Sequence, residues 1–124
     1  MESAMGKARG GSLITFGAGY NSGLYMSGGV LLNLGAPGKS FSPGMVGGTI
    51  YSPIGTTVGE GATIRNMSKT DYKVIFSVLK FETELDIKGL DKFSPENNIL
   101  YITNNGSSEE YNFKSFIKIN SSEL

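Results

Sequence analysis

The letters APGKS bring a glycine, a lysine and a serine together behind an apolar stretch, as at the end of a phosphate-binding loop. Such a loop needs the pattern G-x-x-x-x-G-K-[ST], because its backbone N–H groups surround the phosphate oxygens. Gly38, Lys39 and Ser40 match the end of the pattern, but Asn33 stands where the first glycine is needed. The loop must also open a helix, and residues 41–48 hold one proline and three glycines, which disfavour a helix. We therefore predict a strand followed by a turn, without a nucleotide site.

A second group of residues with chemical potential is the run of carboxylates at Glu82, Glu84 and Asp86, with Asp91 and Glu96 close behind. Their alternation predicts that the first three line one face of a strand. Paired carboxylates can transfer protons or bind a cation such as Ca²⁺. Charges on a strand edge also discourage pairing with other sheets. We favour this last interpretation and keep cation binding and catalysis as alternatives.

The chain contains no histidine and no cysteine. This composition excludes a Ser-His-Asp triad, a Cys-His pair, and any zinc site built on imidazole or thiolate ligands. An enzyme would have to rely on carboxylates, lysine, tyrosine or hydroxyl groups, and no complete motif of that kind is present. We predict a protein that is not an enzyme and that needs neither a cofactor nor a metal.

Eleven basic residues balance eleven acidic residues, so the formal net charge is zero. A duplex-DNA binder normally carries a strongly basic surface, and we predict no nucleic-acid partner. The apolar runs are far shorter than the ~18 residues of a membrane-spanning helix. No charged segment followed by an apolar one opens the sequence, so we expect neither a signal peptide nor a transmembrane helix.

Glycine and charge divide the sequence into two halves. Sixteen of the eighteen glycines lie between Gly6 and Gly61, whereas most charged residues lie beyond them. We predict a single β domain over residues 1–124, with a glycine-rich half at residues 1–66 and a charged β-meander half at residues 67–124. Neither half is large enough to expect an independent core.

The local patterns predict strands almost everywhere. Short strands are expected in the first half, and residues 72–81 are expected to form a well-buried strand because they are rich in aromatic and β-branched side chains. Residues 99–103 and 111–119 flank Asn105 and Gly106, a pair that favours a tight hairpin turn. No stretch of the sequence predicts a helix. The expected fold is all-β, a compact β-sandwich or small barrel of about seven to eight short strands.

Large side chains interspersed among the glycines predict an interaction surface. Its members are Phe16, Tyr20, Leu24, Tyr25, Met26 and Tyr51. Glycine is tolerated in strands where another backbone approaches closely, so the glycine-rich half can pack against neighbouring copies. The sequence therefore favours a structural or assembly protein, such as a minor component of a virion or phage-type particle, whose partners are copies of itself or other assembly subunits.

Two other functions stay open at this stage. Even-numbered residues from 12 to 26 are mostly apolar and odd-numbered ones mostly small or polar. That asymmetry is also typical of a β-hairpin that inserts into a membrane, as in pore-forming or toxin-type domains. The third alternative is a soluble β barrel that binds a ligand.

Overall fold

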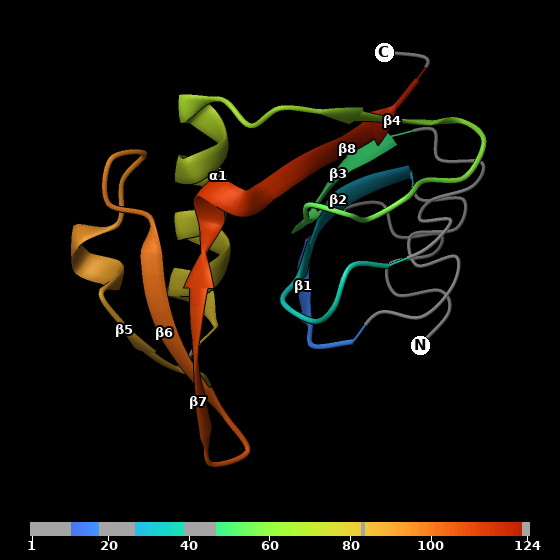
Figure 1. Cartoon of the computed structure of the whole chain (residues 1–124). Helices are drawn as coiled ribbons and strands as arrows, with labels where there is room; N and C mark the ends of the chain where they lie inside the picture. The colour runs from blue at the N-terminus through green and yellow to red at the C-terminus, as the bar shows by residue number, and fades with distance from the viewer. Residues whose placement is uncertain (1–10, 18–26, 39–46, 83, 123–124) are drawn as a thin grey trace. The chain divides into compact units, whose positions relative to one another are not determined.

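The computed structural model describes residues 11–17, 27–38, 47–82 and 84–122 (Figure 1). The chain divides into two compact units. Unit 1 contains residues 1–66 together with 116–124, and unit 2 contains residues 67–115. Unit 2 is therefore inserted into unit 1 along the chain, and each unit is described separately below.

Unit 1 is built on one five-stranded sheet. Its strands are β1 Ser12–Thr15, β2 Ser27–Asn33, β3 Gly47–Pro53, β4 Ala62–Arg65 and β8 Phe116–Ser121. The order in the sheet is β1-β2-β3-β8-β4 (Figure 1). The first three strands are mutually parallel, and β8 is antiparallel to both β3 and β4. Consequently β1 and β4, the two edges of the sheet, run in the same direction.

The three parallel strands repeat one backbone pattern. Ser12 pairs with Val30, and Val30 pairs in turn with Thr49, so nearly equal lengths of chain connect the paired positions. The residue before each of these is a glycine with positive φ: 79° at residue 11, 80° at residue 29 and 81° at residue 48. The sequence shows the same period, with GGSLITFG, GGVLLNLG and GGTIYSPIG as successive copies. Unit 1 is thus founded on an internal repeat, and each copy supplies one parallel strand.

A row of aliphatic side chains crosses this sheet. Leu31, Ile50 and Ile119 are fully buried and stand side by side in the strand register, with Leu13 and Ile64 continuing the row to the two edges. Each buried aliphatic side chain contributes about 1.5–3 kcal/mol through the hydrophobic effect. The row therefore joins β2, β3 and β8 in one core, against which Leu13 of β1 and Ala62 of β4 pack.

Unit 2 contains one helix and a small antiparallel sheet. Its elements are α1 Lys69–Phe81, β5 Asp86–Lys88, the 3₁₀ turn η1 Leu90–Lys92, β6 Ile99–Asn104, β7 Ser107–Asn112 and the 3₁₀ turn η2 Phe113–Ser115. The sheet order is β5-β6-β7. Asn105 and Gly106, with φ of 52° and 79°, form the turn between β6 and β7. The predicted hairpin turn at this pair is confirmed.

The prediction of a strand over residues 72–81, and of no helix at all, is wrong. Residues 69–81 form α1, which begins with a capping box: the Ser68 N–H and hydroxyl donate to the Asp71 carboxylate at 2.7 and 2.9 Å. The buried members Asp71, Ile75, Val78 and Leu79 follow the helical spacing of four, three and one residues. Capping and periodicity outweigh the β propensity of the Val, Ile and Phe residues in this segment.

The predicted single strand over residues 111–119 is also divided. Tyr111 lies in β7, Phe113 lies in η2, and Ile117 and Ile119 belong to β8 in the other sheet. A continuous strand over residues 111–119 is therefore wrong, because the 3₁₀ turn interrupts the alternation of side chains. The coarser expectation holds: the described residues are mostly β, with eight strands in two sheets of five and three.

Candidate functional site

The residues of the predicted interaction surface fall in different places. Phe16 is half-buried directly after β1. Tyr51, in β3, is only 1% exposed and belongs to the core of the chain. Tyr20, Leu24, Tyr25 and Met26 lie outside the described residues. The hairpin behind the membrane-active alternative lies largely outside them as well, and β1, its first arm, pairs in parallel with β2.

The outer edge of β1 is the first candidate site. The N–H groups of Val30 and Leu34 donate to the carbonyls of Gly11 and Thr15, at 3.0 and 2.7 Å. Odd-numbered residues of β1 therefore turn their backbone groups toward β2. Ser12 turns its N–H and carbonyl to the opposite side, and so does Ile14. Among the described residues β1 pairs with β2 alone, so this edge can accept another strand.

A buried polar network follows β2 and β3. The Asn33 amide donates to the Ser52 hydroxyl at 3.1 Å, Ser52 and Thr56 share a hydrogen bond of 2.6 Å, and Thr56 donates to the carbonyl of Pro53 at 2.9 Å. The Gly35 N–H donates to Asn33 Oδ1 at 2.9 Å, and the Gly38 N–H to Thr56 Oγ1 at 3.3 Å.

The backbone N–H groups of Gly35 and Gly38 lie in the stretch that ends with the letters APGKS. Both are bonded within the protein, and Asn33 is fully buried. The network therefore fixes the turn after β2. Lys39 and Ser40, which end the stretch, lie outside the described residues.

The carboxylates do not line one strand face as predicted. Glu82 caps the end of α1, and its Oε1 accepts the backbone N–H of Glu84 at 3.3 Å. Only Asp86 belongs to a strand, β5. The described residues include no group of three or more carboxylates close enough to hold a metal ion. The prediction of an alternating strand fails because the helix extends through Phe81.

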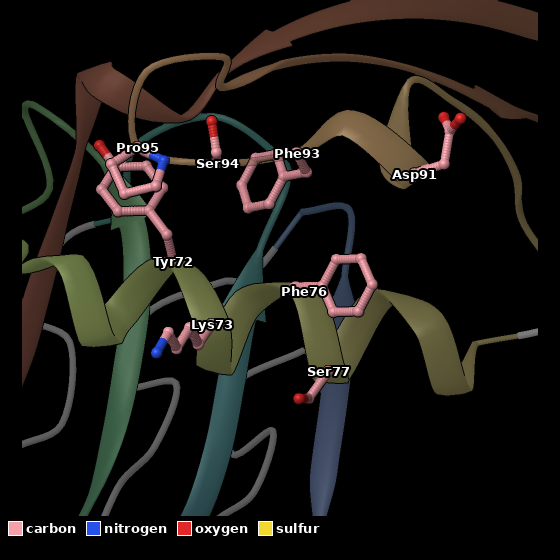
Figure 2. A pocket seen from close by; sticks show the side chains of 8 residues that line it. All are labelled: Tyr72, Lys73, Phe76, Ser77, Asp91, Phe93, Ser94 and Pro95. Carbon is pink, nitrogen blue, oxygen red and sulfur yellow. The ribbon is translucent and has the colours of Figure 1, made fainter.

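The second candidate site is a groove beside α1, which we call the α1 groove (Figure 2). It consists of two adjoining hollows of about 460 and 420 Å³, both bordered by Phe76 and Asp91, and Figure 2 shows the lining of the first. Figure 2 shows the rings of Tyr72 and Phe76 rising from α1 toward Phe93 and Pro95, which come from the chain after η1. Pockets of this size and apolar lining are typical of binding sites.

Aromatic contacts fix one wall of the α1 groove. The ring of Phe93 lies 5.9 Å from that of Tyr72 and packs edge-on against the buried Phe113 at 5.5 Å. On the α1 side, the Lys80 ammonium lies 5.7 Å from the centre of the Phe76 ring, within cation–π distance. The groove is thus apolar at its base, with charged groups at its margin.

One tyrosine that lines the groove has a raised pKa. Burial, and secondly the negative charge of Asp71, raise the pKa of Tyr72 above its ordinary value of 10.0. A raised pKa means that the folded state holds the phenol proton more firmly than the unfolded state does. The resulting stability is present below about pH 10 and is lost as the pH rises through the raised pKa.

We therefore expect the free energy of unfolding to fall more steeply above about pH 10 in the unmodified protein than in Tyr72→Phe. Urea denaturation at several pH values between about 8 and 11 measures both slopes. Tyr111→Phe is a second variant for which a shallower slope than in the unmodified protein is expected, because burial also raises the pKa of Tyr111. Equal slopes for Tyr72→Phe and the unmodified protein would contradict the prediction.

The α1 groove is absent from the sequence predictions because the composition of residues 72–81 predicts a strand. The available signal was the spacing of Lys69, Lys73, Phe76 and Lys80, which are four, three and four residues apart and therefore share one helix face. Within the described part of the chain, no helix is long and apolar enough to cross a membrane. Comparisons with protein-family models, curated proteins and solved structures give no match for this chain.

Proposed function

We propose that the protein is a non-enzymatic assembly component that associates with copies of itself through the glycine-rich repeat of unit 1. The type of assembly we propose is a virion or phage-type particle, in which many copies of a small chain meet along repeated contacts. A β-sandwich or small barrel stays our prediction for the complete fold. The observation that carries the proposal is the outer edge of β1.

Three properties of β1 support edge-to-edge association. Residues Ser12–Thr15 carry no charge and no proline, the features with which proteins commonly block sheet edges. The backbone groups of Ser12 and Ile14 turn outward. β1 is also the first of three repeat strands that pair in parallel with one another. One more parallel strand at its outer edge would continue this arrangement.

The opposite edge of the same sheet supplies a matching strand. Since β4 runs parallel to β1, the β4 strand of one copy can pair with the β1 strand of the next in the same direction as the existing repeat. Such contacts are head-to-tail, and repeated head-to-tail contacts generate rings or filaments. Exposed Ile64 in β4 offers an apolar side chain to that contact.

A substitution at the edge tests the proposal. Ser12→Pro removes one outward N–H and spares the hydrogen bonds of β1 to β2, while Ser12→Ala keeps the N–H. We expect light scattering to give an oligomer for the unmodified protein and for Ser12→Ala, and a mass near 13.2 kDa for Ser12→Pro. Ser12→Lys, which adds an edge charge, is a second variant with the same expected result.

Circular dichroism verifies that each variant keeps its secondary structure. A monomeric unmodified protein at all accessible concentrations would contradict the proposal. An oligomer that persists in both Ser12→Pro and Ser12→Lys would place the contact elsewhere.

A further inference from the structure

The α1 groove has an elongated shape. Its two hollows meet at Phe76 and Asp91, one reaching toward Tyr72 and the other toward Lys80. These two positions are eight residues apart on α1, so the groove follows the helix for about 12 Å. An extended chain of about four residues covers the same length. Both hollows are partly open to solvent.

The α1 side of the groove carries unbalanced positive charge. Lys69, Lys73 and Lys80 share the helix face that holds Phe76, and none of them forms an ion pair with the described residues. The only acid within α1 is Asp71, which is buried and bonded to Ser68. An incoming group therefore meets aromatic rings at the base of the groove and ammonium groups along its α1 margin.

We propose that the α1 groove binds an extended, acidic segment of a partner protein. An aromatic or proline side chain of the segment inserts between Tyr72, Phe76 and Phe93. Acidic side chains on either side of it pair with Lys73 and Lys80. Recognition of this kind combines apolar contact area, which supplies most of the affinity, with charge pairs that select the partner.

Two features favour a peptide over other occupants. Asp91 borders both hollows, so a nucleic acid, which carries a charge at every nucleotide, would place a phosphate near this carboxylate, whereas a peptide can place a neutral residue there and its acidic residues at Lys73 and Lys80. A small molecule is usually enclosed over most of its surface, whereas the two hollows of this groove are partly open to solvent. A peptide satisfies both conditions, because its backbone is neutral and only one side of it needs to be covered.

The probe for the test is a fluorescein-labelled hexapeptide with the sequence Glu-Phe-Pro-Asp-Leu-Glu, read by fluorescence anisotropy against the full chain. Two further probes are matched to it: one replaces the three acids by lysine, and the other replaces the three apolar residues by serine. We expect saturable binding of the acidic peptide alone. Phe76→Ala is expected to weaken it at least tenfold, as for a residue at the centre of an interface.

Charge reversal separates binding from a general effect on folding. The double variant Lys73→Glu and Lys80→Glu is expected to weaken the acidic peptide at least tenfold and to gain affinity for the lysine peptide. Lys114→Glu, an exposed lysine outside the groove, is the matched control and should leave both affinities unchanged within about twofold. A loss of structure cannot produce such an exchange of preference.

Several results would overturn the proposal that the α1 groove binds an acidic peptide. No saturable binding of the acidic peptide up to about 1 mM, the limit of weak specific binding, would overturn the proposal. Equal binding of the acidic and lysine peptides would overturn it as well, and so would binding that survives both Phe76→Ala and the double charge reversal. Tighter binding of a single-stranded oligonucleotide in a parallel titration would assign the groove to a different partner.

Discussion

Gly35→Ala is expected to lower the free energy of unfolding by about 3 kcal/mol or more, the upper range for forced overpacking. An added Cβ at Gly35 would lie 2.5 Å from the backbone nitrogen of Gly17 and 2.7 Å from the backbone carbon of Phe16. These atoms belong to the turn after β1, one repeat earlier in the chain. Because they are backbone atoms, the clash cannot be relieved by a side-chain rotation, and the two turns must separate.

Chemical denaturation followed by circular dichroism measures this loss. Ala36→Ser is the matched control, since it adds one atom at the next residue, on an exposed side chain, and should change stability by less than about 0.5 kcal/mol. Hydrogen exchange should place the loss of protection in β1 and β2. If Gly35→Ala were as stable as the unmodified protein, the close approach of the two turns would be refuted.

Phe113→Ala is expected to cost about 3–5 kcal/mol, the usual range for removing a buried aromatic ring. Phe113 is fully buried and contacts the rings of Phe93 at 5.5 Å and Tyr111 at 6.4 Å. The substitution leaves a cavity beneath Phe93, which forms part of the α1 groove. We therefore expect peptide affinity to fall together with stability.

Phe81→Ala provides the comparison, because it deletes the same ring from a position that is 82% exposed. Its expected effect on the free energy of unfolding is below about 0.5 kcal/mol. Urea denaturation of both variants measures the difference. Similar losses for the two variants would show that Phe113 does not occupy the core of unit 2.

The helix in unit 2 could have been predicted from its capping residues and its helical spacing. The many side chains that favour strands in the same segment point to the wrong structure. Residues 72–81 are rich in side chains that favour strands, and the aromatic residues among them concealed the helical spacing of Asp71, Ile75, Val78 and Leu79. Ser68 and Asp71, three residues apart, were the decisive local signal, because reciprocal capping is specific to a helix start. The turn at Asn105 and Gly106 was predictable because it depends on two residues alone.

Sheet pairing was harder to predict than the strands themselves. The segments that hold β1 to β4 were recognisable, but short strands separated by glycine are usually joined as hairpins. The parallel pairing of β1, β2 and β3 is visible in sequence only through the Gly-Gly pairs that recur at positions 10–11, 28–29 and 47–48. This recurrence is an internal-repeat signal, which indicates that the strands of successive copies are stacked in the same way.

The candidate sites depend on this tertiary arrangement even more strongly. The outward edge of β1 follows from its parallel partner, and the α1 groove joins residues 72–80 to residues 87–95. Neither juxtaposition is encoded by a local motif. What the sequence did indicate was the small number of catalytic possibilities, which follows from the residue types that are missing.

The position of β8 in the sheet has a consequence for how the protein is made. Ile50 of β3 pairs with Ile119 of β8, although more than half of the chain lies between them, and β8 lies between β3 and β4. A ribosome therefore releases β3 and β4 well before the strand that joins them. Contacts this distant along the chain form slowly, because closing a long loop costs entropy before any contact compensates for it. During synthesis, β4 therefore cannot pair with β8 until all of unit 2 has left the ribosome.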